Sequence, residues 1–282
     1  MKTQLIMIVT GAVSLFGLSS CFQVESTITV RKDGSGTISE KMVLGEQMKM
    51  MLAQAGAGGE DPMAQMLDKT KAEARAKAMG EGVEVVSVEK IDAQGKLGVK
   101  TTFRFADINK LKYSPNDAMD KGDAGGNAAD DGDEGSVTFK LADGRLTIIQ
   151  KAPQGDANDA GGFEMVDGKL TLKPQVPQGG GKDAKPEQPE IDPQQLAMMQ
   201  GMMKDMRVTT KVIIESGINS TDATYVDGDT IILSDIRMEK LLADPEKLKS
   251  LQGGDFDQMK KALKGVEGIK FEDKDSITVE MK

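Results

Sequence analysis

The chain lacks most of the side chains on which catalytic and metal sites are commonly built. Its 282 residues include no histidine, no tryptophan and one cysteine, Cys21. Disulfides need paired cysteines and zinc sites need several nitrogen or sulfur ligands, so neither explains Cys21. Without histidine, catalysis would have to rest on carboxylates, lysines, hydroxyls or a bound cofactor. No poised acid, base or nucleophile is visible, so we expect no enzyme, no cofactor and no metal site.

Positive charge is also in short supply. The formal net charge is −9 at pH 7, with 36 lysines and arginines against 45 aspartates and glutamates. Nucleic-acid binding and electrostatic docking on anionic lipid both need basic patches. We therefore expect no nucleic-acid partner and no charge-driven contact with a membrane surface.

The N-terminus has the parts of a secretory signal peptide. Lys2 supplies charge, Leu5 to Leu18 is mostly apolar, and two small serines follow. The apolar run is shorter than the roughly 20 residues that a membrane-spanning helix needs, and polar Gln23 follows soon after it. We therefore expect residues 1–20 to be a cleaved signal, not a permanent membrane span.

The four residues Leu18-Ser19-Ser20-Cys21 closely resemble the lipobox of bacterial lipoprotein precursors. The resemblance implies that the thiol receives a diacylglyceryl group, that the chain is cut before Cys21 and that the new amine is acylated. Each buried CH₂ contributes about 0.8 kcal/mol, so two or three acyl chains hold a protein on a membrane almost permanently. The alternative is an ordinary cleaved signal that leaves an unused cysteine.

On the lipoprotein interpretation the chain is anchored in the cell envelope, and its partner there is the membrane itself, which it contacts through acylated Cys21. The next residue is Phe22. An aspartate at this position is the usual inner-membrane retention signal in enterobacterial lipoproteins. Its absence favours the outer membrane where the organism has two membranes.

Two stretches have a composition that cannot bury enough apolar surface to offset the entropy of ordering. They are Ser114 to Gly135, which is rich in aspartate and glycine, and Pro153 to Pro189. We expect the first to be a disordered loop and the second to be largely loop, with a small hairpin from Phe163 to Leu172. The acidic residues from Asp117 to Glu134 suggest calcium, but no register matches an EF-hand, so we expect a solvated loop.

Asp-Gly and Gln-Gly pairs divide the β-rich parts of the sequence at regular points. Such pairs supply the positive φ angles that tight hairpins need. They predict a mainly antiparallel sheet built from hairpins. The expected strands are Ser26–Val30 with Thr37–Leu44, Val83–Ile91 with Lys96–Phe105, Val137–Leu141 with Arg145–Gln150, Val208–Glu215 followed by Ala223–Val226 and Thr230–Leu233, and Gly268–Phe271 with Ser276–Met281.

Aspartate followed by proline recurs and marks helix starts, because aspartate caps free N–H groups and proline suits the first turn. With the strands, these helices predict an α+β fold in which helices cover a hairpin-built, mainly antiparallel sheet with long acidic disordered loops. The expected helices are Glu46–Gln54, Pro62–Met79, Pro193–Asp205, Ile236–Leu242, Pro245–Leu251 and Phe256–Leu263.

The order of these pieces divides the chain into seven segments. They are the lipoprotein signal peptide (1–20), N-terminal hairpins and helices (21–113), an acidic loop (114–135), a hairpin (136–152), a low-complexity insert (153–192), a methionine-rich helix with a C-terminal hairpin (193–242), and a tail of helices and a hairpin (243–282).

Five stretches within roughly Val24 to Leu242 follow one another in a characteristic order of strands, turns and polar residues: VESTITVRKDGSGTISEKMVL, VEVVSVEK, VKTTFRFADINKL, SVTFKLADGRLTI and MRVTTKVIIESGINSTDATYVDGDTIIL. This order resembles the mycobacterial LppM lipoprotein family and its uncharacterised relatives. The resemblance implies a secreted, lipid-anchored α+β domain with no catalytic signature, and glycolipid binding has been suggested for one branch. The acidic inserts and the tail from Asp244 to Lys282 depart from that branch, so the resemblance identifies no ligand.

Methionine is unusually frequent, with 19 in the chain. Leu196, Met199, Met203 and Met206 form a stripe at helical spacing. One interpretation is core filling, because flexible methionines replace the scarce aromatics. A second is a groove for acyl chains or a partner protein, and a third is thioether binding of Cu(I). If there is a ligand, we expect it to be apolar and to bind between the sheet and this helix, with these four residues in the site.

Three classes of function remain, and they differ in what they require. An enzyme needs a poised group that the sequence does not show. A binding module needs a sheet, a helical cover and an apolar groove, which the sequence can supply. We expect a lipid-anchored envelope module that binds a lipid, an acyl ligand or an envelope protein. The alternative is a structural envelope lipoprotein with no small-molecule ligand.

Overall fold

The computed structural model of the chain describes residues 22–45, 49–50, 62–93, 96–115, 135–151, 163–166, 169–172, 206–242, 260–261 and 263–282. In these residues strands dominate and a few short helices accompany them, so the expected α+β class is confirmed. Several expectations lie outside the described residues. They concern Cys21, Leu196, Met199, Met203, the helices expected at Pro193–Asp205 and Pro245–Leu251, and nearly all of the two loops expected at Ser114–Gly135 and Pro153–Pro189.

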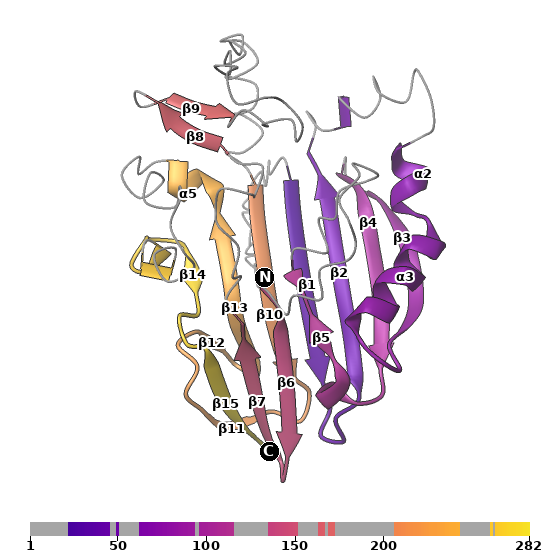
Figure 1. Cartoon of the computed structure of the whole chain (residues 1–282), viewed down its shortest axis with the longest axis vertical. Helices are drawn as coiled ribbons and strands as arrows, with labels where there is room; N and C mark the ends of the chain where they lie inside the picture. Colours follow the sequence, from indigo (N-terminus) through magenta and orange to yellow (C-terminus); the bar gives the residue numbers. More distant parts are fainter. Residues whose placement is uncertain are drawn as a thin grey trace, which may run out of the picture.

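An eight-stranded sheet forms the back layer in Figure 1. Its order is β12-β13-β10-β1-β2-β4-β3, with β14 also beside β13. The central strand β1 pairs antiparallel with β2 and parallel with β10. The strands are β1 (Phe22–Val30), β2 (Gly36–Leu44), β3 (Glu84–Ala93), β4 (Lys96–Phe105), β10 (Met206–Ile214), β12 (Val226–Asp227), β13 (Thr230–Arg237) and β14 (Lys270–Phe271).

A five-stranded antiparallel sheet lies in front of the lower part of the larger sheet (Figure 1). Its order is β11-β15-β7-β6-β5, so two strands from the last quarter of the sequence adjoin three strands from its middle. A separate two-stranded hairpin joins β8 to β9 and confirms the one expected from Phe163 to Leu172. The strands are β5 (Lys112–Tyr113), β6 (Val137–Ala142), β7 (Arg145–Gln150), β8 (Phe163–Val166), β9 (Lys169–Leu172), β11 (Ile218–Thr221) and β15 (Ser276–Met281).

The helices whose bounds are described are short. They are α2 (Pro62–Met66), α3 (Lys69–Met79), the 3₁₀ turn η1 (Ile108–Lys110) and α5 (Met238–Leu242), and residues 49–50, 260–261 and 263 are also helical. The single helix expected from Pro62 to Met79 is divided because the Asp68 carboxylate accepts a hydrogen bond from Thr70 N at 2.7 Å and starts a new helix. Within the described residues, none of the helices is long and apolar enough to cross a bilayer.

Three expected hairpins are confirmed as β1–β2, β3–β4 and β6–β7. The expected C-terminal hairpin is wrong. Phe271 of β14 pairs with Ser234 of the large sheet, whereas Ile277 of β15 pairs with Ile148 of the small sheet. The two segments thus find partners in different sheets, and this tertiary pairing prevails over the local turn between them.

Several boundaries also differ from those expected, most clearly those of β1 and β13, because cross-strand pairing extends further than local sequence indicates. The first strand begins at Phe22, four residues before the expected start, since it pairs along its whole length with β2 and β10. At the other side of the sheet, Ile236 pairs with Val208 and extends β13, so the expected helix begins only at Met238.

The main core lies between the two sheets. Side chains alternate between the faces of a strand, so the front residues of the large sheet meet the smaller sheet and α3. The back face of the large sheet instead carries ion pairs, between Glu25 and Lys211 and between Arg207 and Asp235. Core residues with 0% exposure include Ile28, Ile38, Phe103, Ile148, Val212, Ile214 and Ile277.

Candidate ligand-binding face

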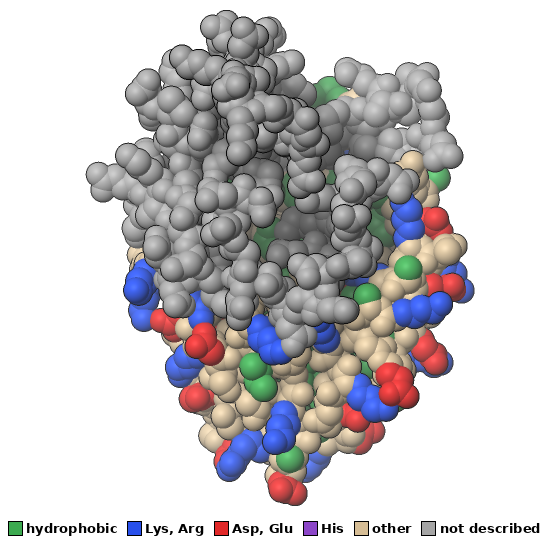
Figure 2. All heavy atoms as spheres, in the orientation of Figure 1, with side chains coloured by type: hydrophobic (Ala, Val, Ile, Leu, Met, Phe, Trp, Pro, Cys, Tyr) green, Lys and Arg blue, Asp and Glu red, His purple; other side chains and the backbone are tan. Residues whose placement is uncertain are grey.

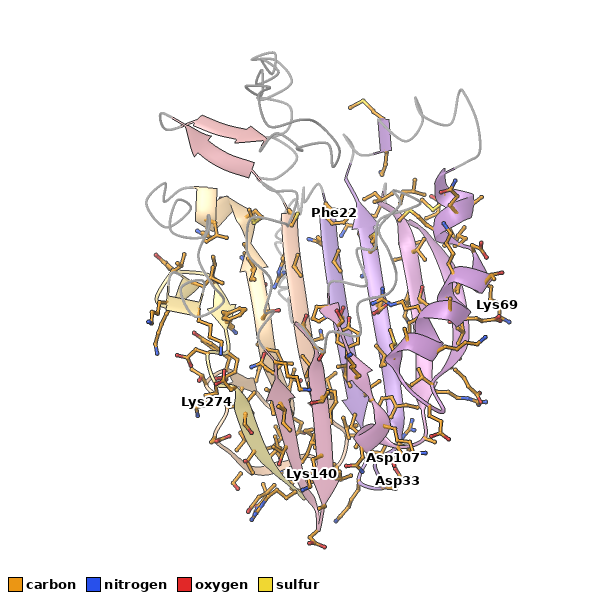
Figure 3. The ribbon with its side chains drawn as sticks, in the orientation of Figure 1. Phe22, Asp33, Lys69, Asp107, Lys140 and Lys274 are labelled. Carbon is orange, nitrogen blue, oxygen red and sulfur yellow. The ribbon has the colours of Figure 1, made fainter. Side chains whose placement is uncertain are left out.

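The front face of the large sheet is divided into two halves at the level of Ser26. Ser26 points to the front because its hydroxyl contacts Tyr113 of the smaller sheet. Alternation then places Phe22 and Val24 above it, and Ile28 below it, on the same face. Figure 3 labels Phe22 at the upper end of β1 and Asp33 at the opposite end, in the turn to β2.

The lower half, from Ser26 toward Asp33, is closed. Ile28, Ile38 and Val212 have no exposed surface and belong to the cluster that also contains residues of β6, β7, β15 and α3. This half therefore forms part of the hydrophobic core between the two sheets.

A row of polar residues crosses the front face at the boundary between the halves. Strand register aligns these residues side by side on five neighbouring strands, so they share one face. We call this row the polar belt. It consists of Ser234, Thr210, Ser26, Glu40 and Thr101, on β13, β10, β1, β2 and β4 respectively.

Side chains from β5 and α3 pair with the centre of the belt. Tyr113 Oη lies 2.5 Å from Ser26 Oγ and 3.1 Å from Glu40 Oε1, and Arg75 Nη2 lies 2.7 Å from the same carboxylate oxygen. Burial, followed by the neighbouring Glu40 carboxylate, raises the pKa of Tyr113 far above its ordinary value. The phenol therefore stays protonated, and Arg75 forms an ion pair with Glu40 beside it.

Two polar atoms of this region have no hydrogen-bond partner in the described part of the chain. They are Thr210 Oγ1 and Arg75 Nε, and both are buried. Thr210 as a whole is 2% exposed. Buried hydroxyl and N–H groups are paired in the great majority of cases, so such atoms call for an explanation.

Above the belt every front-facing position on β1, β2, β10 and β13 is apolar. We call this area the upper apolar half. On the side of β2 and β4 it is covered by α2, from which Met63 packs against Leu44 and Val99. The members are Phe22 and Val24 of β1, Met42 and Leu44 of β2, Leu97 and Val99 of β4, Met206 and Val208 of β10, and Ile236 of β13.

Met206 requires a correction. The expected helical stripe placed it one turn after Met203, but it is the first residue of β10 and pairs in parallel with Phe22. Pairing with β1 gives the backbone of Met206 and the following residues their inter-strand hydrogen bonds, which a helix that continued through Met206 would not form. Met206 is nevertheless half-buried at the upper end of the apolar half, while the other three residues of the stripe lie outside the described residues.

The described surface visible in Figure 2 has no large patch of side chains with the same charge. Figure 2 shows lysine and arginine side chains intermixed with aspartate and glutamate. Exposed ion pairs among the described residues include Arg145 with Glu280 at 3.1 Å and Lys110 with Glu81 at 2.9 Å. Among the described residues, no three acidic, histidine or cysteine side chains are placed to hold a metal ion.

The polar belt was missed by sequence reasoning, although one signal for it exists. Three strands interrupt an inward apolar series with a polar residue, namely Ser26, Glu40 and Thr210. No such signal exists for Arg75 and Tyr113, because their partners are distant in sequence. Arg75 of α3 lies 35 residues from Glu40, and Tyr113 of β5 lies 87 residues from Ser26.

Comparison with known proteins adds a fold-level link. No family model matches the chain, and no curated protein matches it. Among solved structures, the NMR structure of the folded domain of LppM from Mycobacterium tuberculosis covers 96% of this chain and 96% of its own, at 10% identity and a TM-score of 0.35. The chain thus has a weak structural likeness to the LppM type, too distant to carry an argument about function.

Proposed function

We propose that the chain is a lipid-anchored binding module of the cell envelope, which holds an apolar ligand on the upper apolar half and catalyses no reaction. One observation carries the proposal. The apolar front positions continue beyond the polar belt to the end of the sheet at which β1 begins, one residue after Cys21. An acyl ligand would thus be held beside the point at which the chain meets the membrane.

The composition of the upper apolar half suits a flexible chain. Met42 and Met206 are unbranched and rearrange easily, and both are half-buried. Burial of each ligand CH₂ is worth about 0.8 kcal/mol before ordering costs, which corresponds to at most about fourfold in affinity. Affinity should therefore rise with chain length from decanol to dodecanol to tetradecanol.

The anchor is part of the same proposal. Cys21 is acylated, the mature chain starts there, and the absence of an aspartate after Cys21 favours the outer membrane where two membranes exist. Since β1 begins at Phe22 and one residue spans at most about 3.6 Å, the sheet stands close to the bilayer. Intact-mass measurement of the membrane-extracted protein checks this, and an unmodified thiol on a membrane-free chain would contradict it.

The ligand is tested by extracting the purified protein and identifying co-purified lipids by mass spectrometry. Val208→Gln places an amide in the upper apolar half, and Thr209→Gln places it on the back face of the same strand as a matched control. We expect lipid to accompany the wild type and Thr209→Gln but to be depleted in Val208→Gln. If no lipid accompanies the folded wild type, the structural envelope lipoprotein becomes the better description.

A further inference from the structure

Thr210 combines deep burial with an unused hydroxyl. The residue is 2% exposed, and Thr210 Oγ1 has no partner among the described residues. A valine of the same shape would fill this position without leaving a buried polar group unpaired. The hydroxyl is therefore a cost to the folded protein alone, and a ligand that hydrogen-bonds to it would remove that cost.

Thr210 lies in the polar belt, at the lower edge of the upper apolar half. Thr210 lies on the front face of β10, next to Ser26 of β1 and Ser234 of β13 in the strand register. The next front-facing residue above it is Val208, which belongs to the upper apolar half. A chain lying over Val208 and Met206 would therefore meet Thr210 at one end.

Arg75 offers a second donor along the same row. Its Nη2 already binds Glu40, but its Nε has no partner in the described part of the chain. Thr210 and Glu40 are separated by β1, and two strand spacings amount to about 10 Å. A head group with several oxygen atoms is needed to reach both donors, since one hydroxyl cannot.

The Glu40 carboxylate in the belt selects the kind of head group. Arg75 donates to it at 2.7 Å, and the two side chains are 16% and 11% exposed. A carboxylate or phosphate would bring a second anionic group beside Glu40 in this buried place, which is costly. An uncharged ester or glyceryl head supplies acceptors for Arg75 Nε and Thr210 Oγ1 without that cost.

We infer that the upper apolar half binds a neutral single-chain lipid of the acylglycerol class, with its head oxygens on Thr210 and Arg75 and its chain directed toward Phe22. This inference rests on the proposed function and adds the chemistry of the head group to it. Recognition then depends on a hydrogen bond at the inner end and on apolar burial over the rest of the ligand.

The test uses the full chain carrying Cys21→Ser, which removes the anchor, and three ligands with the same chain length. Monolaurin has a neutral ester head, laurate an anionic head, and dodecane no head. Displacement of the apolar dye Nile red reports their affinities. Thr210→Val removes the hydroxyl, Thr210→Ser retains it, and Thr209→Val is the matched control on the back face of β10.

We expect monolaurin to bind more tightly than laurate, and Thr210→Val to weaken monolaurin about fivefold, the equivalent of one net hydrogen bond, while dodecane is unchanged. Thr210→Ser and Thr209→Val should keep the wild-type preference. The inference is overturned if laurate binds at least as well as monolaurin or if Thr210→Val leaves the ratio of monolaurin to dodecane unchanged. If none of the three binds, the proposed function itself fails.

Discussion

The two halves of the front face are built from the same strands with the same alternation, yet they end up in different surroundings. Below the polar belt, Ile28 and Ile38 are fully buried under a second sheet. Above it, Met42 and Val208 are only half-buried, although Val24 between them is 3% exposed. The described cover comes from α2 over β2 and β4, and from the cluster of Leu241, Leu263 and Ile269 beside Ile236. The apolar pattern therefore extends beyond the area that the second sheet closes, which is why we propose a ligand for the upper half.

The largest expected effect separates the halves by stability. Ile28→Ala should lower the free energy of unfolding by about 2–5 kcal/mol, because a fully enclosed cavity remains. Met42→Ala, at a half-buried position on the neighbouring strand, should lower it by about 1 kcal/mol. Urea unfolding measures both. Equal losses at the two positions would show that the upper half is core of the same kind.

The next effect concerns the belt between the halves. Arg75→Met keeps the aliphatic stem but removes the guanidinium that pairs with the Glu40 carboxylate, so we expect a loss of about 2–3 kcal/mol, somewhat less than for a fully buried pair. Arg145→Met breaks the exposed pair with Glu280 and should cost about 0–1 kcal/mol.

The same urea unfolding measurements compare these two variants. A loss at Arg75 as small as that at Arg145 would mean that water already screens the Arg75–Glu40 pair. The belt would then be open to solvent, and the charge argument for a neutral head group would fail.

The fold was predictable where local chemistry decides it. Asp33-Gly34 and Asp143-Gly144 mark the turns of hairpins β1–β2 and β6–β7, and both residues of the second turn adopt positive φ. The fate of Ile277 was not predictable in this way, because β15 pairs with β7 from a different part of the sequence. Local patterns indicate where a strand exists but not which edge accepts it.

The candidate site was predictable only in its character. An apolar site between the sheet and the methionine-rich helix was expected, and Met206, one of its four residues, lies on the upper apolar half, but as part of a strand and not of a helix. Helical spacing at Met206 was a coincidence of sequence, overridden by pairing with β1. The unpaired Thr210 hydroxyl depends on strand register, since Thr209 and Thr210 are indistinguishable by type and only register assigns one to each face.

The smallest effect sharpens the contrast between the front and the back of the upper half. On the back face, Asp235 accepts hydrogen bonds from Arg207 Nε at 2.7 Å and from Arg207 Nη2 at 2.8 Å. Burial acts to raise the pKa of Asp235, but the hydrogen bonds and charge of Arg207 outweigh it, and the pKa lies below its ordinary value.

Because the folded-state pKa of Asp235 is the lower one, the unfolded chain binds more protons at acid pH. The stabilisation is therefore complete above the ordinary pKa and is lost as the pH falls through the folded-state value. We expect Asp235→Asn to cost about 1 kcal/mol at about pH 6, since Arg207 is partly exposed, and progressively less toward about pH 3. Urea unfolding of the wild type and Asp235→Asn across this range measures the difference. A difference that stays constant with pH would show that Arg207 binds the asparagine as well as the carboxylate, and that the back face of the upper half is held by hydrogen bonds and not by charge.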